Sequence, residues 1–305
     1  MRLLLVIAIT LISAANGFGQ HVALQSHYIF NGVALNPAYT GSDDAFSLIG
    51  SFRTQWTGFD GAPTTQTFTA HAPMRDLTSS VGIQVYADQI GVDRETGVYG
   101  SYSYRFRTGQ KSVLALGAAG GVSFIRGFYS QLAVVDGGDD LLNDSPLSVL
   151  PDFSFGAHFH TDKYFLSFST PMFLSHELSG TDVKLTNDFS NYNFLFAGGY
   201  EFSINREFKI KPSVLARLRF DAKPQLDINT MVSFNPSFDF GLSYRTQEAI
   251  IGLFKFNANQ QWSLIYSFGM PLNSIMAYTA GSHEISLKYS FMYKTKVSTP
   301  RFLGW

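Results

Sequence analysis

The 305-residue sequence contains no cysteine, which excludes a disulfide framework, a thiolate metal site and a thiol nucleophile. It also lacks an excess of either charge, because 22 Lys and Arg residues stand against 23 Asp and Glu residues, for a net charge of −1. A nucleic-acid binder would carry a basic excess. Charged residues make up only 15% of the chain, whereas soluble globular domains have roughly 25%.

Long hydrophobic runs are also missing. After the first 19 residues no apolar run approaches the ~18–20 residues that a membrane-spanning helix requires, and the longest, residues 113–122, is rich in Ala and Gly. Aromatic residues are abundant instead, at 15% of the chain with 29 Phe and 15 Tyr. This composition excludes an intrinsically disordered chain and leaves two classes, a soluble β protein or a membrane β-barrel.

The N-terminus has the pattern of a secretory signal. Arg2 supplies a positive charge and residues 3–12 are apolar. Small residues at positions 15 and 17, or 17 and 19, suit the two subsites of a cleavage site. We therefore predict a signal peptide over residues 1–19 and export of the mature chain; the alternative is a buried N-terminal helix. Because no cysteine follows the apolar stretch, a lipoprotein anchor is excluded.

After residue 44 the chain alternates between apolar and small or polar residues. Phe238, Phe240, Leu242 and Tyr244, for example, alternate with polar or small neighbours, and a period of two places each set on one face of a strand. We count about fourteen such segments of about ten residues, the length of a membrane-spanning strand. The predicted strands are 45–56, 64–73, 78–89, 94–106, 111–125, 151–161, 163–170, 191–203, 208–219, 223–234, 238–246, 248–257, 261–270 and 283–293.

The connections between these segments differ in length by position. Connections after even-numbered strands are short, and some carry turn residues such as Thr108-Gly109 and Asn235-Pro236. The long connections, 126–150, 171–190 and 271–282, all follow odd-numbered strands. Short turns at one rim and longer loops at the other are typical of outer-membrane barrels.

The sequence therefore predicts an all-β fold, a transmembrane antiparallel β-barrel of about 14 strands of the outer-membrane type. The barrel is expected over residues 45–294, preceded by a periplasmic or lumenal segment at 20–44 and followed by a tail at 295–305. The aromatic positions of the last strand, Tyr289, Phe291 and Tyr293, suit a signal for barrel insertion; the alternative is an ordinary edge strand.

Two dense motifs carry a resemblance to a known family. The first is Tyr28-Ile-Phe-Asn31 with Asn36-Pro-Ala-Tyr-Thr-Gly41, and the second runs from Arg53 through Trp56-Thr-Gly-Phe-Asp-Gly-Ala-Pro63 to His71. With Gly82 and Asp88-Gln-Ile-Gly91, these stretches resemble the PorP/SprF family of Bacteroidota. The resemblance implies an outer-membrane protein associated with type IX secretion and gliding motility.

The motif residues also have an interpretation from their chemistry. Trp56 and Phe59 belong at the outer end of the first strand, where an aromatic girdle is expected, and Arg53 and Gln55 should face the lumen together with His71. Two interpretations stay open: a polar network that fixes the barrel to the preceding segment, and a docking site for a partner. The candidate residues are Asn31, Asn36, Pro37, Gly41, Arg53, Gln55, Trp56, Gly58, Phe59, Gly61, Pro63 and His71.

Other chemical motifs are weak. His158 and His160 share a strand face, but no third ligand is assured, so we interpret them as lumenal residues and predict no metal site. The acidic stretch 136–144 lacks the spacing of an EF-hand and is interpreted as a solvated outer loop. No G-x-S-x-G or H-E-x-x-H motif occurs, and we predict neither an enzyme nor a cofactor.

Two functions follow. The first is a non-enzymatic component of a secretion or motility machine that anchors or helps export a secreted adhesin through protein–protein contacts. The resemblance implies type IX periplasmic components and a secreted adhesin, or its C-terminal targeting domain, as partners. The alternative is a porin or small-solute channel, since a barrel of this size encloses a lumen.

Overall fold

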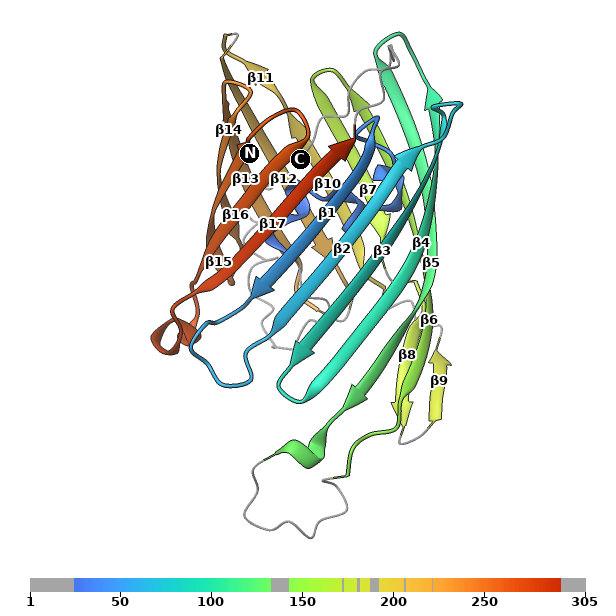
Figure 1. The fold of residues 1–305 in the computed structure, drawn as a ribbon, viewed down its shortest axis with the longest axis vertical. Coiled ribbons are helices and arrows are strands. Elements are labelled where there is room, and N and C mark those ends of the chain that lie inside the picture. The colour runs from blue at the N-terminus through green and yellow to red at the C-terminus, as the bar shows by residue number, and fades with distance from the viewer. Residues whose placement is uncertain are drawn as a thin grey trace, which may run out of the picture.

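The computed structural model describes residues 25–132, 143–171, 173–179, 182–186, 192–205, 207–220 and 222–291. These residues form an antiparallel β-barrel closed by fourteen strands, shown in Figure 1. The predicted signal peptide at 1–19 and the tail at 295–305 lie outside the described residues. Within the described residues, no helix combines the length and the apolarity needed to cross a membrane.

The barrel strands follow one another around the wall in chain order. They are β1 (Phe46–Thr54), β2 (Thr64–Pro73), β3 (Ser79–Ile90), β4 (Asp93–Arg107), β5 (Ser112–Gly127), β6 (Ser148–Thr161), β7 (Tyr164–Thr170), β10 (Phe194–Tyr200), β12 (Phe208–Leu218), β13 (Gln225–Phe234), β14 (Phe238–Arg245), β15 (Ala249–Asn257), β16 (Trp262–Pro271) and β17 (Ser282–Phe291).

The first and last strands pair with each other and close the wall. β1 pairs with β17 from Phe46 opposite Phe291 to Thr54 opposite His283, and β10 bridges β7 and β12. Each barrel strand therefore has a neighbour on both sides, which removes the unpaired edges that hydrocarbon does not tolerate. The all-β fold and the strand number confirm the prediction from alternation.

Alternation of side chains separates the two faces of the wall. Large apolar residues point outward and remain exposed, among them Phe52, Phe68, Leu166, Leu242 and Leu287. Inward residues are buried and many are polar, such as Arg245 and Glu284, at 1% and 2% exposure. A surface that is apolar outside and polar inside is what a lipid-embedded barrel requires.

Two features depart from the strand predictions. The segment expected as one strand over 191–203 is interrupted at Glu201, and a short β11 (Phe202–Ser203) follows the break. Glu201 donates its main-chain N–H to the Lys163 carbonyl at 2.7 Å, and its carboxylate pairs with Lys209 and Lys211. These contacts hold the chain at the barrel rim, where the regular ladder ends.

The second departure lies in the connection 171–190, where no strand was expected. A separate two-stranded hairpin forms there from β8 (Ser175–Ser179) and β9 (Asp182–Thr186). Figure 1 shows this hairpin at the lower end of the barrel, beyond β6 and beside the longer connections. The hairpin lies outside the barrel wall, so its strands do not need one apolar face toward lipid. The alternation of apolar and polar residues that predicts the barrel strands therefore does not predict this hairpin.

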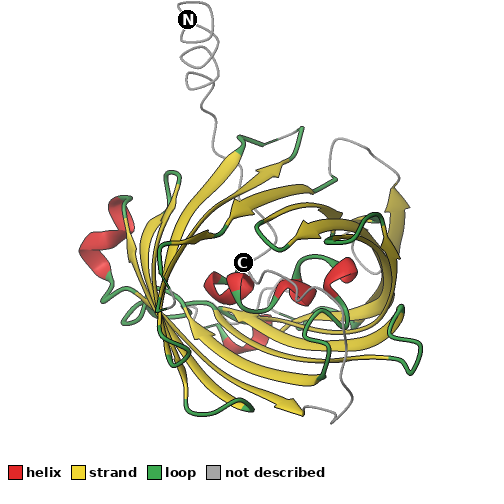
Figure 2. Ribbon diagram, turned by 90° about the horizontal axis from the view of Figure 1, so that it is seen from above, coloured by secondary structure: helices red, strands yellow, loops and turns green. Residues whose placement is uncertain are grey.

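Residues 25–44 lie inside the barrel. They form three short 3-10 helices, η1 (Ser26–Ile29), η2 (Gly32–Ala34) and η3 (Pro37–Tyr39), which Figure 2 shows in red within the ring of strands. Two further 3-10 helices, η4 (Tyr129–Gln131) and η7 (Ser274–Tyr278), belong to connections at the rim. We call residues 25–44 the lumen plug.

Candidate functional site: the lumen and its plug

Local sequence explains the shape of the plug. The Asn36 side chain accepts a hydrogen bond from the Ala38 N–H at 2.8 Å and caps η3, the role for which Asn is preferred at helix starts. Pro37 follows at the first helical position, where it has no N–H to leave unpaired. Gly41 turns the chain with φ of 78°, a left-handed conformation that favours glycine. The Asn36–Gly41 motif is therefore a compact turn.

One side of the plug packs against an apolar part of the wall. Tyr28, Ile29, Val33, Leu35 and Tyr39 form a buried cluster with inward side chains of β7, β10, β12, β13 and β15. The wall members are Phe165, Leu195, Ala197, Leu215, Met231, Ala249, Ile251 and Leu253. Burial of these apolar side chains favours packing of the plug against this part of the wall.

The opposite side of the plug bonds to a polar part of the wall. Glu284 on β17 accepts the main-chain N–H groups of Ser26 and His27 at 2.7 and 3.3 Å. Arg53 on β1 reaches the same carboxylate at 3.4 Å and donates to the Ser26 hydroxyl at 3.0 Å. His27 hydrogen-bonds Ser286 at 2.5 Å. The start of the plug is thus held by a buried ion pair that also satisfies its backbone.

Asn36 fastens the middle of the plug to β6 and β7. Its Nδ2 donates to the Ser167 hydroxyl at 2.7 Å and to the carbonyls of Phe168 and Ala157 at 3.1 and 3.2 Å. Two wall glycines make room for this approach, because a Cβ on Gly117 would overlap the Pro37–Ala38 backbone and a Cβ on Gly156 would overlap Asn36. A side chain at either position would push the plug away from the wall.

Charged residues hold the end of the plug. His71 on β2 accepts the Gly41 N–H at 3.0 Å, and Lys288 on β17 pairs with Asp43 at 2.7 Å. Arg105 on β4 pairs with Asp44 at 2.7 Å and also donates to the Gly41 carbonyl. The chain therefore enters β1 from a point that is tied to three different strands.

Two ionisable groups of the plug have shifted pKa values. Burial lowers the pKa of His27 below its ordinary value, and Arg53 adds to this while Glu284 opposes it. Burial raises the pKa of the Asp43 carboxyl, but the adjacent Lys288 ammonium is the largest of several opposing contributions, and together these bring the pKa below its usual range. At neutral pH these shifts favour a neutral His27 and an ionised Asp43.

Most of the candidate residues from the sequence meet at the plug. Asn31 accepts a hydrogen bond from Thr69 at 3.1 Å, Gln55 accepts one from Arg53 at 3.2 Å, and Asn36, Gly41 and His71 make the contacts described above. Arg53 and His71 face the lumen, as alternation predicts. The contacts fit the interpretation of a polar network; a role in partner binding stays a prediction.

The remaining candidates lie in the first connection, 55–63, away from the plug. Gly58 and Gly61 have φ of 96° and 74°, and the Trp56 N–H donates to the Ser282 hydroxyl at 3.2 Å. Phe59 is 49% exposed. Pro63 accepts the Gln55 N–H at 2.9 Å through its carbonyl. This tight turn presents aromatic side chains at the rim.

His158 and His160 lie buried on the lumenal face of β6. Their rings stack at 5.5 Å, and His158 packs on Tyr39 of the plug at 4.1 Å. Within the part of the chain that the structure describes, no group of three or more His, Cys, Asp or Glu residues has the geometry to hold a metal ion. Both histidine rings pack within the lumen.

Sequence reasoning did not single out several lumenal charges. Arg245 on β14 forms a two-pronged pair with Asp227 on β13, at 3.0 and 2.9 Å, and a third bond to Glu248 at 3.0 Å. Glu284 was also missed. The available signal was a charge at an inward position of a strand, which identifies a lumenal residue but does not name its partner.

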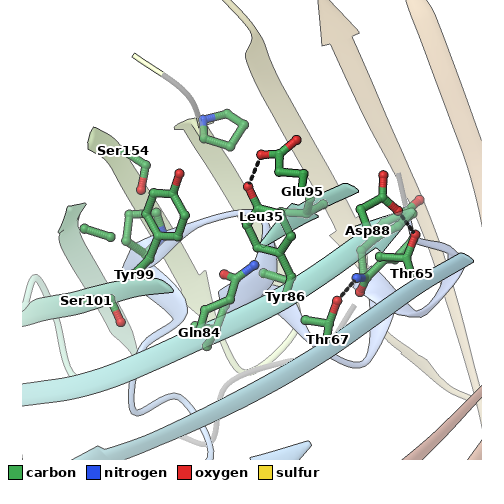
Figure 3. A pocket seen from close by; sticks show the side chains of 17 residues that line it. Leu35, Thr65, Thr67, Gln84, Tyr86, Asp88, Glu95, Tyr99, Ser101 and Ser154 are labelled. Carbon is green, nitrogen blue, oxygen red and sulfur yellow. Dashed lines mark hydrogen bonds between the residues drawn. The ribbon is translucent and has the colours of Figure 1, made fainter. Parts of the chain in front are cut away.

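A cavity of about 160 Å³ separates the plug from the wall formed by β2 to β6, as Figure 3 shows. Val33, Leu35 and Pro37 form its plug side. The wall side is lined by Thr65, Thr67, Gln84, Tyr86, Asp88, Glu95, Tyr99, Ser101, Ala119 and Ser154. It is partly open, and its lining combines hydroxyls, two carboxylates and three tyrosine rings.

Comparisons with known proteins found one matching family and several solved structures with a similar fold. A family model described as type IX secretion system membrane protein PorP/SprF matches residues 17–289. Among solved structures, the chain is similar to the CymD monoaromatic hydrocarbon channel, at 11% identity and a TM-score of 0.52 over 92% of this chain and 96% of that chain. It is also similar to the Pseudomonas putida toluene transporter TodX, at 10% identity and a TM-score of 0.50 over the same shares. No curated protein matches the sequence.

Proposed function

The chain belongs to the PorP/SprF family of type IX secretion system membrane proteins, and we propose that it is a non-enzymatic outer-membrane anchor of that machinery. In this proposal the barrel holds, or helps to export, a secreted adhesin through contacts with the adhesin or its C-terminal targeting domain. In the same proposal, periplasmic type IX components bind at the periplasmic rim of the barrel, and the adhesin contacts the outer rim. The barrel fold and the family are shared with secretion and transport proteins of membranes.

The filled lumen is the observation that supports an anchor over an open pore. The plug buries an apolar face against five wall strands and is bonded to the remaining side through Glu284, Arg53 and Arg105. A barrel whose interior is packed in this way provides rigidity rather than a wide water-filled path.

The two rims suggest the direction of the barrel in the membrane. Connections at one end are short, such as 108–111, 162–163 and 235–237, while the hairpin β8–β9 and η7 lie at the other. By the rule for outer-membrane barrels the short turns face the periplasm. The connections at the other rim, including the tight turn 55–63 with Trp56 and Phe59, would then meet an exported partner. Export would follow cleavage of the predicted signal at 1–19.

A small-solute channel is the second candidate. The cavity beside the plug favours it, and the two similar structures reported above are a monoaromatic hydrocarbon channel and a toluene transporter. At 10–11% identity this likeness extends to the fold alone. Of the two candidates, the packed plug fits the anchor better.

Current through planar bilayers separates the two functions. We expect the purified mature protein to give no large steady open-channel current, and we expect a deletion strain to lose surface display of at least one type IX cargo. Pull-down of periplasmic type IX components or of a large adhesin with the tagged barrel would support the anchor. A stable current from the intact protein, with all cargo still displayed by the deletion strain, would favour the channel.

A further inference from the structure

We propose that the cavity between the lumen plug and strands β2 to β6 is a binding site for a ligand that carries a positively charged amine on an apolar or aromatic stem. The inference rests on the lining of this cavity and does not depend on the anchor function. It concerns residues that take no part in holding the plug through ion pairs.

Two carboxylates define the charge of the site. Asp88 on β3 and Glu95 on β4 are directly opposite each other in the strand register, and both line the cavity. Like charges in that arrangement destabilise a sheet. A cation placed between them would remove the repulsion, so the site has a built-in preference for positive charge.

Three other lumenal carboxylates have cationic partners. Glu284 pairs with Arg53, Asp227 with Arg245, and Asp44 with Arg105. Within the described residues, Asp88 and Glu95 differ because neither forms an ion pair with Lys, Arg or His.

Neutral hydroxyl groups bind these two carboxylates instead. Asp88 accepts a hydrogen bond from the Thr65 hydroxyl, and Glu95 accepts one from the Tyr86 hydroxyl, both at 2.5 Å. Such bonds orient the carboxylates but place no cationic group in contact with them. An ammonium group entering the cavity would supply the missing positive charge.

Aromatic rings specify the rest of the ligand. Tyr86 and Tyr99 stack at 6.1 Å with an interplanar angle of 14°, and both rings line the cavity beside the carboxylates, as Figure 3 shows. Tyrosine faces attract cations and apolar stems alike. Val33 and Leu35 of the plug close the opposite side with apolar surface. The chemistry therefore fits an amine attached to a ring or a short hydrocarbon chain.

The position of the site gives it a route to one rim. Asp88 and Glu95 lie two residues from the ends of the β3–β4 hairpin at Ile90 and Asp93, and Thr65 is the second residue of β2, just after the connection 55–63. The cavity is thus near the rim that bears the longer connections. A ligand would enter from there, either as a free small amine or as a basic side chain of a polypeptide.

Calorimetric titration of the full-length mature barrel in detergent tests the proposal. We expect phenethylamine to bind, and we expect its neutral analogue 2-phenylethanol to bind about tenfold more weakly or worse, as the loss of a charged hydrogen bond predicts. The double variant Asp88→Asn with Glu95→Gln should lose this preference for the amine. Equal binding of amine and alcohol, or no binding of the amine, would overturn the proposal.

Asp93→Asn is the matched control, because it removes one carboxylate from the same hairpin at an exposed position that does not line the cavity. It should leave amine binding unchanged, and an equal loss in this variant would refute a local site.

The single variant Asp88→Asn replaces the double variant if the double variant does not fold. An acetylated Gly-Lys-Phe amide identifies the source: tighter binding than phenethylamine assigns the site to a polypeptide side chain, and weaker binding assigns it to a free amine.

Discussion

At the scale of single residues, a buried charge in the lumen stabilises the structure only when its oppositely charged partner is present. Arg53 and Glu284 are both nearly excluded from solvent, with side-chain exposures of 6% and 2%. Removing both charges from water is costly, and the cost is offset only when the pair and its hydrogen bonds are complete. Glu284 meets this condition because it also accepts two main-chain N–H groups of the plug.

Glu284→Ala should therefore release the start of the plug. The change leaves the Arg53 guanidinium without its carboxylate and two backbone donors without an acceptor, at an expected cost of about 3–5 kcal/mol. Protease cleavage within residues 25–44 of the refolded barrel should become faster. Glu284→Gln, which keeps an acceptor oxygen, should have a smaller effect. Glu207→Ala in an exposed turn is the control, and cleavage as fast there as in Glu284→Ala would contradict the prediction.

Gly117→Ala tests the close approach of plug and wall. The added methyl would overlap the backbone of Pro37 and Ala38, and overpacking of this kind typically costs about 1–3 kcal/mol. The same protease assay should show a displaced plug. Gly100→Ala on β4 is matched to it, because a Cβ there meets nothing within 4 Å. Identical behaviour of the two variants would show that the approach is not tight.

At the scale of elements, each strand combines a lipid-facing row with a lumenal row. On β17, Ile285 and Leu287 are 48% and 49% exposed on the outer face, whereas Glu284 and Ser286 are buried at 2% and 1%. Because the period is two, a shift of register by one residue would exchange the rows. The strands are therefore fixed in register by the difference between lipid and lumen.

Leu287→Arg should destabilise the barrel strongly. Leu287 lies near the middle of β17 and faces outward, and an arginine at the bilayer midplane costs about 2–4 kcal/mol. Urea unfolding of the barrel in lipid vesicles measures the change. Leu272→Arg makes the same replacement just beyond the end of β16, where Leu272 is 45% exposed, and should cost about 0–1 kcal/mol. Equal costs would argue against a lipid-facing position for Leu287.

At the scale of the whole molecule, the barrel and the plug depend on each other. The closed wall satisfies its own backbone. Its inner face carries an apolar cluster contributed by β7, β10, β12, β13 and β15 and polar residues on β1, β2, β4 and β17. The Arg245–Asp227 ion pair is also buried there, on β14 and β13. The plug matches this arrangement, with Ile29 and Leu35 on one side and its bonds to Glu284 and Arg105 on the other.

Deletion of residues 25–43 should turn the barrel into a leaky pore. Removing the plug opens the lumen and exposes apolar wall residues such as Leu215 and Ile251 to water, so lower thermal stability is expected together with a steady bilayer current. The intact protein, reconstituted in the same way, is the reference. A folded deletion variant that stays closed would show that other parts of the chain seal the lumen.

The sequence by itself determined the all-β class, the number of strands and the face that each residue occupies. Those properties depend on neighbours two residues apart and on short turns. The alternation from Phe238 to Arg245 is enough to indicate a strand, and Asn235-Pro236 is enough to indicate a turn, without information from the rest of the chain. The broken strand at Glu201 and the hairpin β8–β9 were not foreseen, because long-range contacts and not periodicity create them.

Only the tertiary structure decided what fills the lumen and which charges meet there. Ser26 and Glu284 are separated by 258 residues, and Arg53 and Glu284 by 231. They come together because the last strand pairs with the first and the segment before the first strand folds back inside. Alternation in the sequence predicts that a residue faces inward. Which other inward residue it contacts is determined by how the barrel closes.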